Sequence, residues 1–170
     1  AYMIYQVGAL QAFCDSYGVT LQHMKLHGAF YNTACVTPAL ADAVLDGLQA
    51  VNPDIAAMVL SGSYIAKEAE RRGIPVIQEV FADRGYTDEG TLVPRTEPGA
   101  FIKDPQEALE RVLMMVTEGK VVTNTGNTID IVADSVCVHG DNPEAIAFTN
   151  YIREGLTKAG VTVANFQNRK

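Results

Sequence analysis

Helix-capping residues followed directly by proline constrain the fold of this chain more than any other feature. A capping side chain accepts a backbone N–H that would otherwise be unpaired, and proline at the first helical position has no N–H to leave unpaired. Glycines after helical stretches predict helix ends, because a left-handed residue is often needed there. The helix starts are Thr37-Pro38, Asp104-Pro105 and Asn142-Pro143, and the ends are Gly18, Gly73, Gly119 and Gly160.

Short apolar runs alternate with these helices along the chain. The runs predict strands at residues 21–26, 56–60, 75–81, 135–138 and 161–163. Residues 121–122 and 129–132 flank a polar segment and predict a hairpin. Alternation of strands and helices predicts an α/β fold with a parallel sheet, in a single domain over residues 1–170. Periodicity leaves open whether the sheet is open or part of a barrel.

Composition and charge narrow the function classes. Hydrophobic residues make up 48% and charged residues 19% of the 170 residues, as in globular domains. The 13 basic residues stand against 20 acidic ones, which argues against nucleic acid or anionic lipid as a partner. No apolar run approaches the roughly 20 residues that span a bilayer. The three cysteines have no CxxC spacing, so we expect a reduced, cytoplasmic setting.

Polar side chains follow the predicted strands. Parallel α/β folds place their sites where strands end, so these side chains indicate a site. After the second strand, the segment 61–63 (Ser-Gly-Ser) fits either a site or a simple helix cap. The candidate residues are Lys25, His27 and Asn32 after the first strand, Glu79, Asp83 and Arg84 at the third, and His139 and Asp141 after the strand at 135–138.

The candidate residues suit hydrolysis of an amide. A histidine side chain ordinarily titrates near neutrality, so the residue type of His27 and His139 fits acid–base catalysis or binding of a divalent metal. Asp83 is expected to orient a histidine or to act as the base, and Arg84 to hold a substrate carboxylate in a bidentate fashion. The sequence has no HExxH pattern, which would support a metal site, and no GxxxxGK[ST] loop, which would support a P-loop nucleotide site.

Four segments carry a resemblance to a known family. Residues 25–32, KLHGAFYN, resemble the KPHGALYN of the LamB/YcsF family, the family of the 5-oxoprolinase A subunits. Residues 79–86, EVFADRGY, are similar to its EVFADRAY, and residues 136–141, VCVHGD, to its ICVHGD. Residues 91–95, TLVPR, resemble the segment that leads to an HDP helix start in the family. The four segments occur in the family's order and cover nearly the whole chain.

The resemblance implies a distorted, seven-stranded β/α barrel related to carbohydrate deacetylases. It implies ATP-dependent hydrolysis of 5-oxo-L-proline to L-glutamate, with ATP as a co-substrate, in a complex with the 5-oxoprolinase subunits B and C. His27, Asp83 and His139 would then be catalytic. Lys25, Asn32, Glu79, Arg84 and Asp141 would bind substrate, and His27 and His139 are possible ligands of a divalent metal.

Beyond single substitutions such as Leu26 and Phe30 within the matching segments, two departures from the family pattern bear on function. Lys103 stands where the family has the histidine of HDP, and the family's opening segments have no counterpart in this chain. We therefore expect a barrel without its first strands, and a chain that is inactive alone. Two alternative functions remain open: a metal-dependent, deacetylase-like hydrolase, and a truncated subunit that has no catalytic role.

Overall fold

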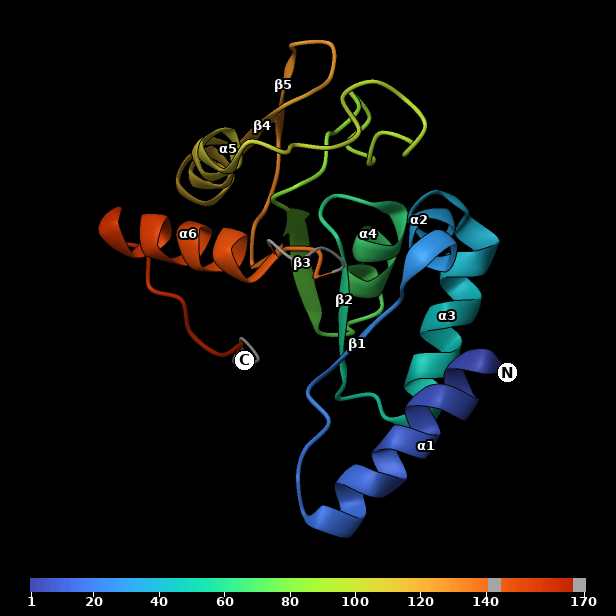
Figure 1. The fold of residues 1–170 in the computed structure, drawn as a ribbon. Coiled ribbons are helices and arrows are strands. Elements are labelled where there is room, and N and C mark those ends of the chain that lie inside the picture. The colour runs from blue at the N-terminus through green and yellow to red at the C-terminus, as the bar shows by residue number, and fades with distance from the viewer. Residues whose placement is uncertain (141–144, 167–170) are drawn as a thin grey trace. The chain divides into compact units, whose positions relative to one another are not determined.

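The computed structural model describes residues 1–140 and 145–166. This part of the chain contains six helices and six strands (Figure 1). It divides into two compact units, residues 1–78 and residues 79–170, with the boundary inside strand β3 (Val76–Phe81).

The first unit combines four helices with parallel strands. β1 and β2 pair in parallel, with His23 opposite Ala56 and Lys25 opposite Met58. The backbone N–H of Ala57 also donates to the carbonyl of Pro75, at 2.8 Å, just before β3 begins. The elements are α1 (Tyr2–Tyr17), β1 (His23–Lys25), α2 (Gly28–Val36), α3 (Pro38–Val51), β2 (Ala56–Leu60) and α4 (Tyr64–Arg71).

Helix α3 is the centre of this unit. Its apolar stripe of Val44, Leu45 and Leu48 is at most 1% exposed, and the helix packs against α1, α2 and α4. Spacings of three and four residues place the stripe on one helical face, which explains its burial.

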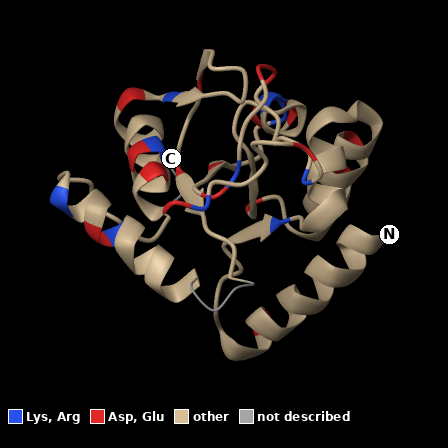
Figure 2. Ribbon diagram, turned by 45° about the horizontal axis from the view of Figure 1, so that its top comes forward, with Lys and Arg blue, Asp and Glu red and all other residues tan. Residues whose placement is uncertain are grey.

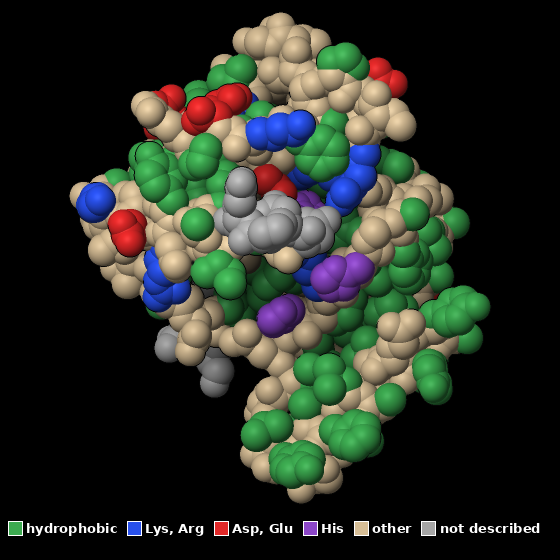
Figure 3. Space-filling view, in the orientation of Figure 1, with side chains coloured by type: hydrophobic (Ala, Val, Ile, Leu, Met, Phe, Trp, Pro, Cys, Tyr) green, Lys and Arg blue, Asp and Glu red, His purple; other side chains and the backbone are tan. Residues whose placement is uncertain are grey.

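Helix α1 is apolar on more than one side. Met3 and Val7 are buried, yet six large side chains of the same helix are at least 50% exposed. Asp15 is its one charged residue, and Figure 2 accordingly shows the helix next to the N-terminus almost free of charge. Figure 3 shows the apolar side chains on its surface. Four of the six exposed side chains, Tyr2, Tyr5, Phe13 and Tyr17, are named below as the aromatic face of α1, and the other two are Ile4 and Leu10.

The second unit contains one parallel strand pair and one antiparallel ribbon. β3 pairs in parallel with β6, with Glu79 opposite Ser135 and Phe81 opposite Cys137. β4 and β5 form the ribbon, and α5 packs against α6 and β4. The further elements are α5 (Pro105–Glu118), β4 (Lys120–Val122), β5 (Thr128–Asp130), β6 (Ser135–Cys137) and α6 (Ala145–Lys158).

Most predicted elements are confirmed, with one exception. Parallel strand pairs, the hairpin and the left-handed glycines after the helices are all present. The strand predicted at 161–163 is wrong: these residues follow α6 without strand pairing. Asn142 and Pro143 lie outside the described residues. The mixed α/β class is confirmed, whereas the seven-stranded barrel and the single domain stay predictions.

Among the described residues, no single helix has the length and apolar character to cross a membrane. One pair of consecutive helices in the described ranges, α2 and α3, passes that test when taken together, with a bend of 113° between them.

Candidate active site

A histidine and an aspartate meet at the carboxyl ends of β3 and β6. The Nδ1 atom of His139 lies 2.7 Å from Oδ2 of Asp83, and the two side chains are 27% and 19% exposed. Because a carboxylate only accepts, the ring donates from Nδ1, which leaves the lone pair on Nε2. A histidine held in this way has the form of a general base supported by a carboxylate.

The surroundings of this pair fix its geometry. The ring of Phe81 stacks on that of His139, with centroids 5.8 Å apart and an angle of 28° between the planes. The second oxygen of Asp83, Oδ1, is buried and has no hydrogen-bond partner among the described residues. A buried carboxylate oxygen without a partner retains its capacity to accept a hydrogen bond, for example from a substrate N–H or a water molecule.

A loop over residues 83–102 holds Asp83 in place. The carbonyl of Asp83 accepts from the N–H of Ile102 at 3.0 Å, and the N–H of Gly85 donates to the carbonyl of Ala100 at 3.1 Å. Bridges between Arg84 and Phe101 and between Tyr86 and Leu92 close the loop further. The position of Asp83 is therefore set by backbone hydrogen bonds on both sides of the loop.

Arg84 is part of that loop rather than free to meet a ligand. Its Nε donates to the carbonyl of Ala100 at 2.9 Å, its Nη2 donates to the carbonyl of Val93 at 2.6 Å, and the residue is 3% exposed. Burial lowers the pKa of the guanidinium, and the nearby charge of Arg95 lowers it further. This geometry favours a structural role for Arg84 over the predicted bidentate contact with substrate.

Two more buried residues lie near the strand end. The hydroxyl of Tyr86, a fully buried residue, accepts from the backbone N–H of Phe81 at 2.9 Å. Burial raises the pKa of Tyr86 well above its usual value. Glu79 is 2% exposed on β3, two residues before Phe81 in the chain.

The predicted residues of the first unit gather where β1 meets α2. His27 is the residue before α2 and is exposed, and Gly28 follows it with φ 62°, a value that favours glycine. The ammonium of Lys25 lies 5.8 Å from the centre of the Tyr31 ring. Asn32 donates from Nδ2 to the carbonyl of Gly28 at 3.4 Å. The turn thus carries an exposed imidazole two residues after a partly buried lysine.

The structure places the other candidates as follows. Asp141 lies outside the described residues. In the segment 61–63, Ser63 caps α4 by accepting from the N–H of Ala66, so its helix-cap reading is confirmed. No three side chains of His, Cys, Asp or Glu converge as a metal site within the described part of the chain. Binding of metal by His27 or His139 stays a prediction.

Sequence reasoning missed the residues that support the pair. Phe81 and Tyr86 entered the sequence analysis only as parts of the segment 79–86 that resembles the family. An aromatic residue in or next to a strand is usually interpreted as a core residue. Their stacking and hydrogen bonding depend on the path of the loop, which no local pattern encodes. Their place within two to three residues of Asp83 was the one available signal.

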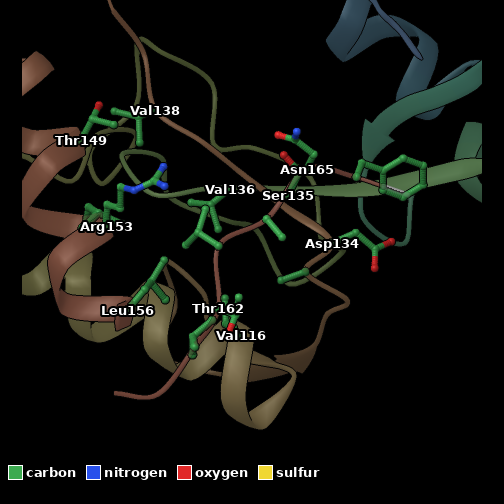
Figure 4. Close-up of a pocket in the computed structure, with 16 residues that line it drawn as sticks. Val116, Asp134, Ser135, Val136, Val138, Thr149, Arg153, Leu156, Thr162 and Asn165 are labelled. Atoms are coloured by element: carbon green, nitrogen blue, oxygen red, sulfur yellow. The ribbon is translucent and has the colours of Figure 1, made fainter. Parts of the chain in front are cut away.

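A cavity of about 530 Å³ lies elsewhere in the second unit, between β6, α5, α6 and the segment after α6 (Figure 4). Its walls are mostly apolar, with Thr149 and Arg153 contributed by α6. Neither His139 nor Asp83 lines it. The paired imidazole and carboxylate at the strand ends, rather than this cavity, form the candidate active site.

Comparison with known proteins identifies the family. The profile of the LamB/YcsF family matches residues 1–170. A protein of Fusobacterium nucleatum, named as the A subunit of 5-oxoprolinase, is 58% identical over 163 residues, which is 96% of this chain and 63% of that protein. One of Pyrococcus horikoshii with the same name is 47% identical over 95% of this chain and 64% of that protein.

A solved structure agrees with these relatives. The crystal structure of a lactam utilization protein from Thermus thermophilus matches with a TM-score of 0.86 and 40% sequence identity, over 96% of this chain and 65% of that one. The chain thus spans a little under two thirds of the length of these proteins. With its profile match over all residues and its closely similar relatives, the chain belongs to the LamB/YcsF family.

Proposed function

We propose that this chain is the part of a 5-oxoprolinase A subunit that carries the His139–Asp83 pair, and that this pair opens a cyclic amide. The observation that carries the proposal is the 2.7 Å contact between the His139 ring and the Asp83 carboxylate at the strand ends. The names of the similar proteins, which refer to 5-oxoprolinase and to lactam utilization, supply the substrate class.

Opening of the ring needs one water molecule and two successive proton transfers. The Nε2 atom of His139 takes a proton from water, whose oxygen attacks the ring carbonyl carbon of 5-oxo-L-proline. The bond between this carbon and the ring nitrogen then breaks. The protonated imidazole returns its proton to the departing nitrogen, which yields L-glutamate. Asp83 keeps the ring oriented and stabilises its positive charge during these steps.

We further propose that the reaction depends on ATP and on partner subunits. ATP would transfer its γ-phosphoryl group to the amide oxygen with release of ADP. After water has attacked and the ring has opened, a second water molecule would hydrolyse the resulting acyl phosphate and release phosphate. This chain has no P-loop motif, so we assign activation to the 5-oxoprolinase subunits B and C. The similar proteins carry the letter A in their subunit names, and this lettering implies further subunits in those proteins.

The test is release of glutamate from 5-oxo-L-proline by the complex assembled with its partner subunits, with and without ATP. We expect glutamate only with ATP present, and none from the 170-residue chain alone. A folded, complete complex that releases no glutamate under either condition would refute the proposal. Loss of activity with a chelator, combined with hydrolysis of acetylated sugars, would instead establish the deacetylase-like alternative.

A further inference from the structure

The loop over residues 83–102 holds two arginines on one aromatic ring. The guanidinium carbon of Arg84 lies 5.2 Å from the centre of the Phe101 ring, and that of Arg95 lies 5.5 Å from the same centre. The face of an aromatic ring attracts cations, which explains why the ring keeps both guanidinium groups in place. Two positive charges are therefore concentrated at a single point of the loop.

The two arginines differ in the hydrogen bonds that their guanidinium groups donate. Arg84 is buried and donates to the carbonyls of Ala100 and Val93. Arg95 is exposed, and no residue in the described part of the chain accepts a hydrogen bond from its side chain or forms an ion pair with it. The N–H groups of its planar guanidinium are therefore available to donate hydrogen bonds to a ligand.

Electrostatics at this point favours an anion. Arg84 also has no carboxylate within ion-pair distance among the residues that the structure describes. The proximity of the two cations contributes to the lowered pKa of Arg84. A ligand carboxylate beside Arg95 would offset this repulsion and would pair with a guanidinium already ordered by Phe101.

The loop connects this cation to the catalytic pair. Phe101 is bridged to Arg84, the residue next to Asp83, and the N–H of Ile102 donates to the carbonyl of Asp83. The same backbone thus positions Asp83 and the ring on which Arg95 lies. A substrate with a carboxylate next to its reacting ring has the chemistry that such an arrangement recognises.

We propose that Arg95 binds the carboxylate of the cyclic amide substrate, while Arg84 acts as a positioning residue that holds the loop. This inference rests on the proposed function. It replaces the assignment made from the sequence, in which Arg84 binds the carboxylate. Arg95 then determines specificity for lactams that carry a carboxylate over lactams that lack one.

The test compares the Arg95→Gln, Arg95→Lys and Arg153→Gln variants in the assembled complex. Arg153 is an exposed arginine on α6, outside the loop, and serves as the matched control. Loss of a charge-assisted hydrogen bond costs roughly 1.5–3 kcal/mol, so Arg95→Gln should raise the KM for 5-oxo-L-proline by about 10- to 100-fold. We expect kcat to change much less, Arg95→Lys to recover part of the affinity, and Arg153→Gln to behave as the wild type.

A neutral competitor separates charge recognition from general damage to the site. Inhibition by 2-pyrrolidone, the same ring without its carboxylate, should be unchanged in Arg95→Gln. If the wild-type complex is active and Arg95→Gln has an unchanged KM for 5-oxo-L-proline, the proposed role of Arg95 is overturned, and the proposed function is not affected. Equal weakening of 5-oxo-L-proline and 2-pyrrolidone would also overturn this role. A wild-type complex that does not turn over the lactam would instead refute the proposed function itself.

Discussion

At the scale of single residues, the contact between His139 and Asp83 determines what the site can do. The carboxylate selects the imidazole tautomer with hydrogen on Nδ1, because it accepts a hydrogen bond from that atom. An amide in place of the carboxylate can donate to Nδ1 and favour the other tautomer, in which Nε2 has no lone pair. The identity of one side-chain atom at residue 83 thus decides whether His139 can accept a proton.

This reasoning predicts the effects of two substitutions. In the assembled complex, His139→Ala should reduce kcat by roughly 100-fold or more, and Asp83→Asn should also reduce it, without unfolding the protein. Steady-state kinetics and thermal melting of each variant provide the measurement. Wild-type turnover in His139→Ala would exclude an acid–base role for this residue.

The hydroxyl oxygen of Tyr86 affects the stability of the fold rather than the chemistry of the site. Tyr86→Phe removes the hydroxyl that accepts from the buried backbone N–H of Phe81. We expect the free energy of unfolding to fall by about 0.5–1.5 kcal/mol in chemical denaturation. Tyr17→Phe is the control, because Tyr17 is 80% exposed and should have almost no effect. Equal effects of the two substitutions would contradict this account.

At the scale of elements, a cluster of charges joins α3 to α4. Arg72, at the end of α4, contacts Glu68 of the same helix and Asp42 and Asp46 of α3, all at 2.6–2.7 Å. Hydrogen bonds from Arg71 and Arg72 lower the pKa of Glu68 from 4.5 to about 2. One arginine therefore compensates three carboxylates that would otherwise repel one another.

The lowered pKa of Glu68 predicts a sensitivity to acid. A depressed pKa contributes stability above the unfolded value of 4.5, and this contribution is lost as the pH falls toward 2. Arg72→Gln should therefore flatten the decline in unfolding free energy over this pH range. Arg71→Gln should do so as well, because the hydrogen bonds from Arg71 are the largest cause of the lowered pKa of Glu68. Identical pH profiles for wild type and Arg72→Gln would refute the prediction.

Prediction from sequence succeeded where the signal was local. Asp104 caps α5 by accepting from the N–H groups of Gln106 and Glu107, and Gly119 ends the helix with φ 66°. Thr37 stands before α3 as predicted, but its side chain makes no capping hydrogen bond. Residues 161–163 have strand composition without a strand partner, and composition alone cannot supply one.

The candidate site could be predicted only in part, because only some of its features are encoded by local sequence patterns. Asp83 and His139 were found because the ends of parallel strands collect functional residues. Their direct contact, the burial of Arg84 and the exposure of Arg95 depend on tertiary contacts of the loop, which connect residues 9 to 56 positions apart. Local patterns do not report contacts at such separations.

At the scale of the whole molecule, the aromatic face of α1 stands out. Four aromatic side chains at 67–80% exposure lie on a helix that has a single charge. Each such side chain offers on the order of 150–250 Å² of surface, so together they form an apolar patch of several hundred Å². Patches of this size on an isolated chain favour association with other apolar surfaces.

We therefore expect the 170-residue chain to associate as its concentration rises. Phe13→Glu, which places a charge within the aromatic face, should shift sedimentation velocity profiles toward the monomer. Gln49→Glu adds the same charge at an exposed position of α3 and should leave the profiles unchanged. A wild-type chain that stays monomeric at all concentrations tested would contradict the prediction.

The separation of 56 residues between Asp83 and His139 has a consequence for synthesis of the chain. At 5–20 residues per second, the ribosome adds His139 roughly 3–11 s after Asp83. The acceptors of Arg84 are the carbonyls of Val93 and Ala100, which leave the ribosome before His139, so the loop can close before β6 emerges. We expect the carboxylate to be in position before its histidine leaves the ribosome, and the catalytic pair to form when β6 joins β3.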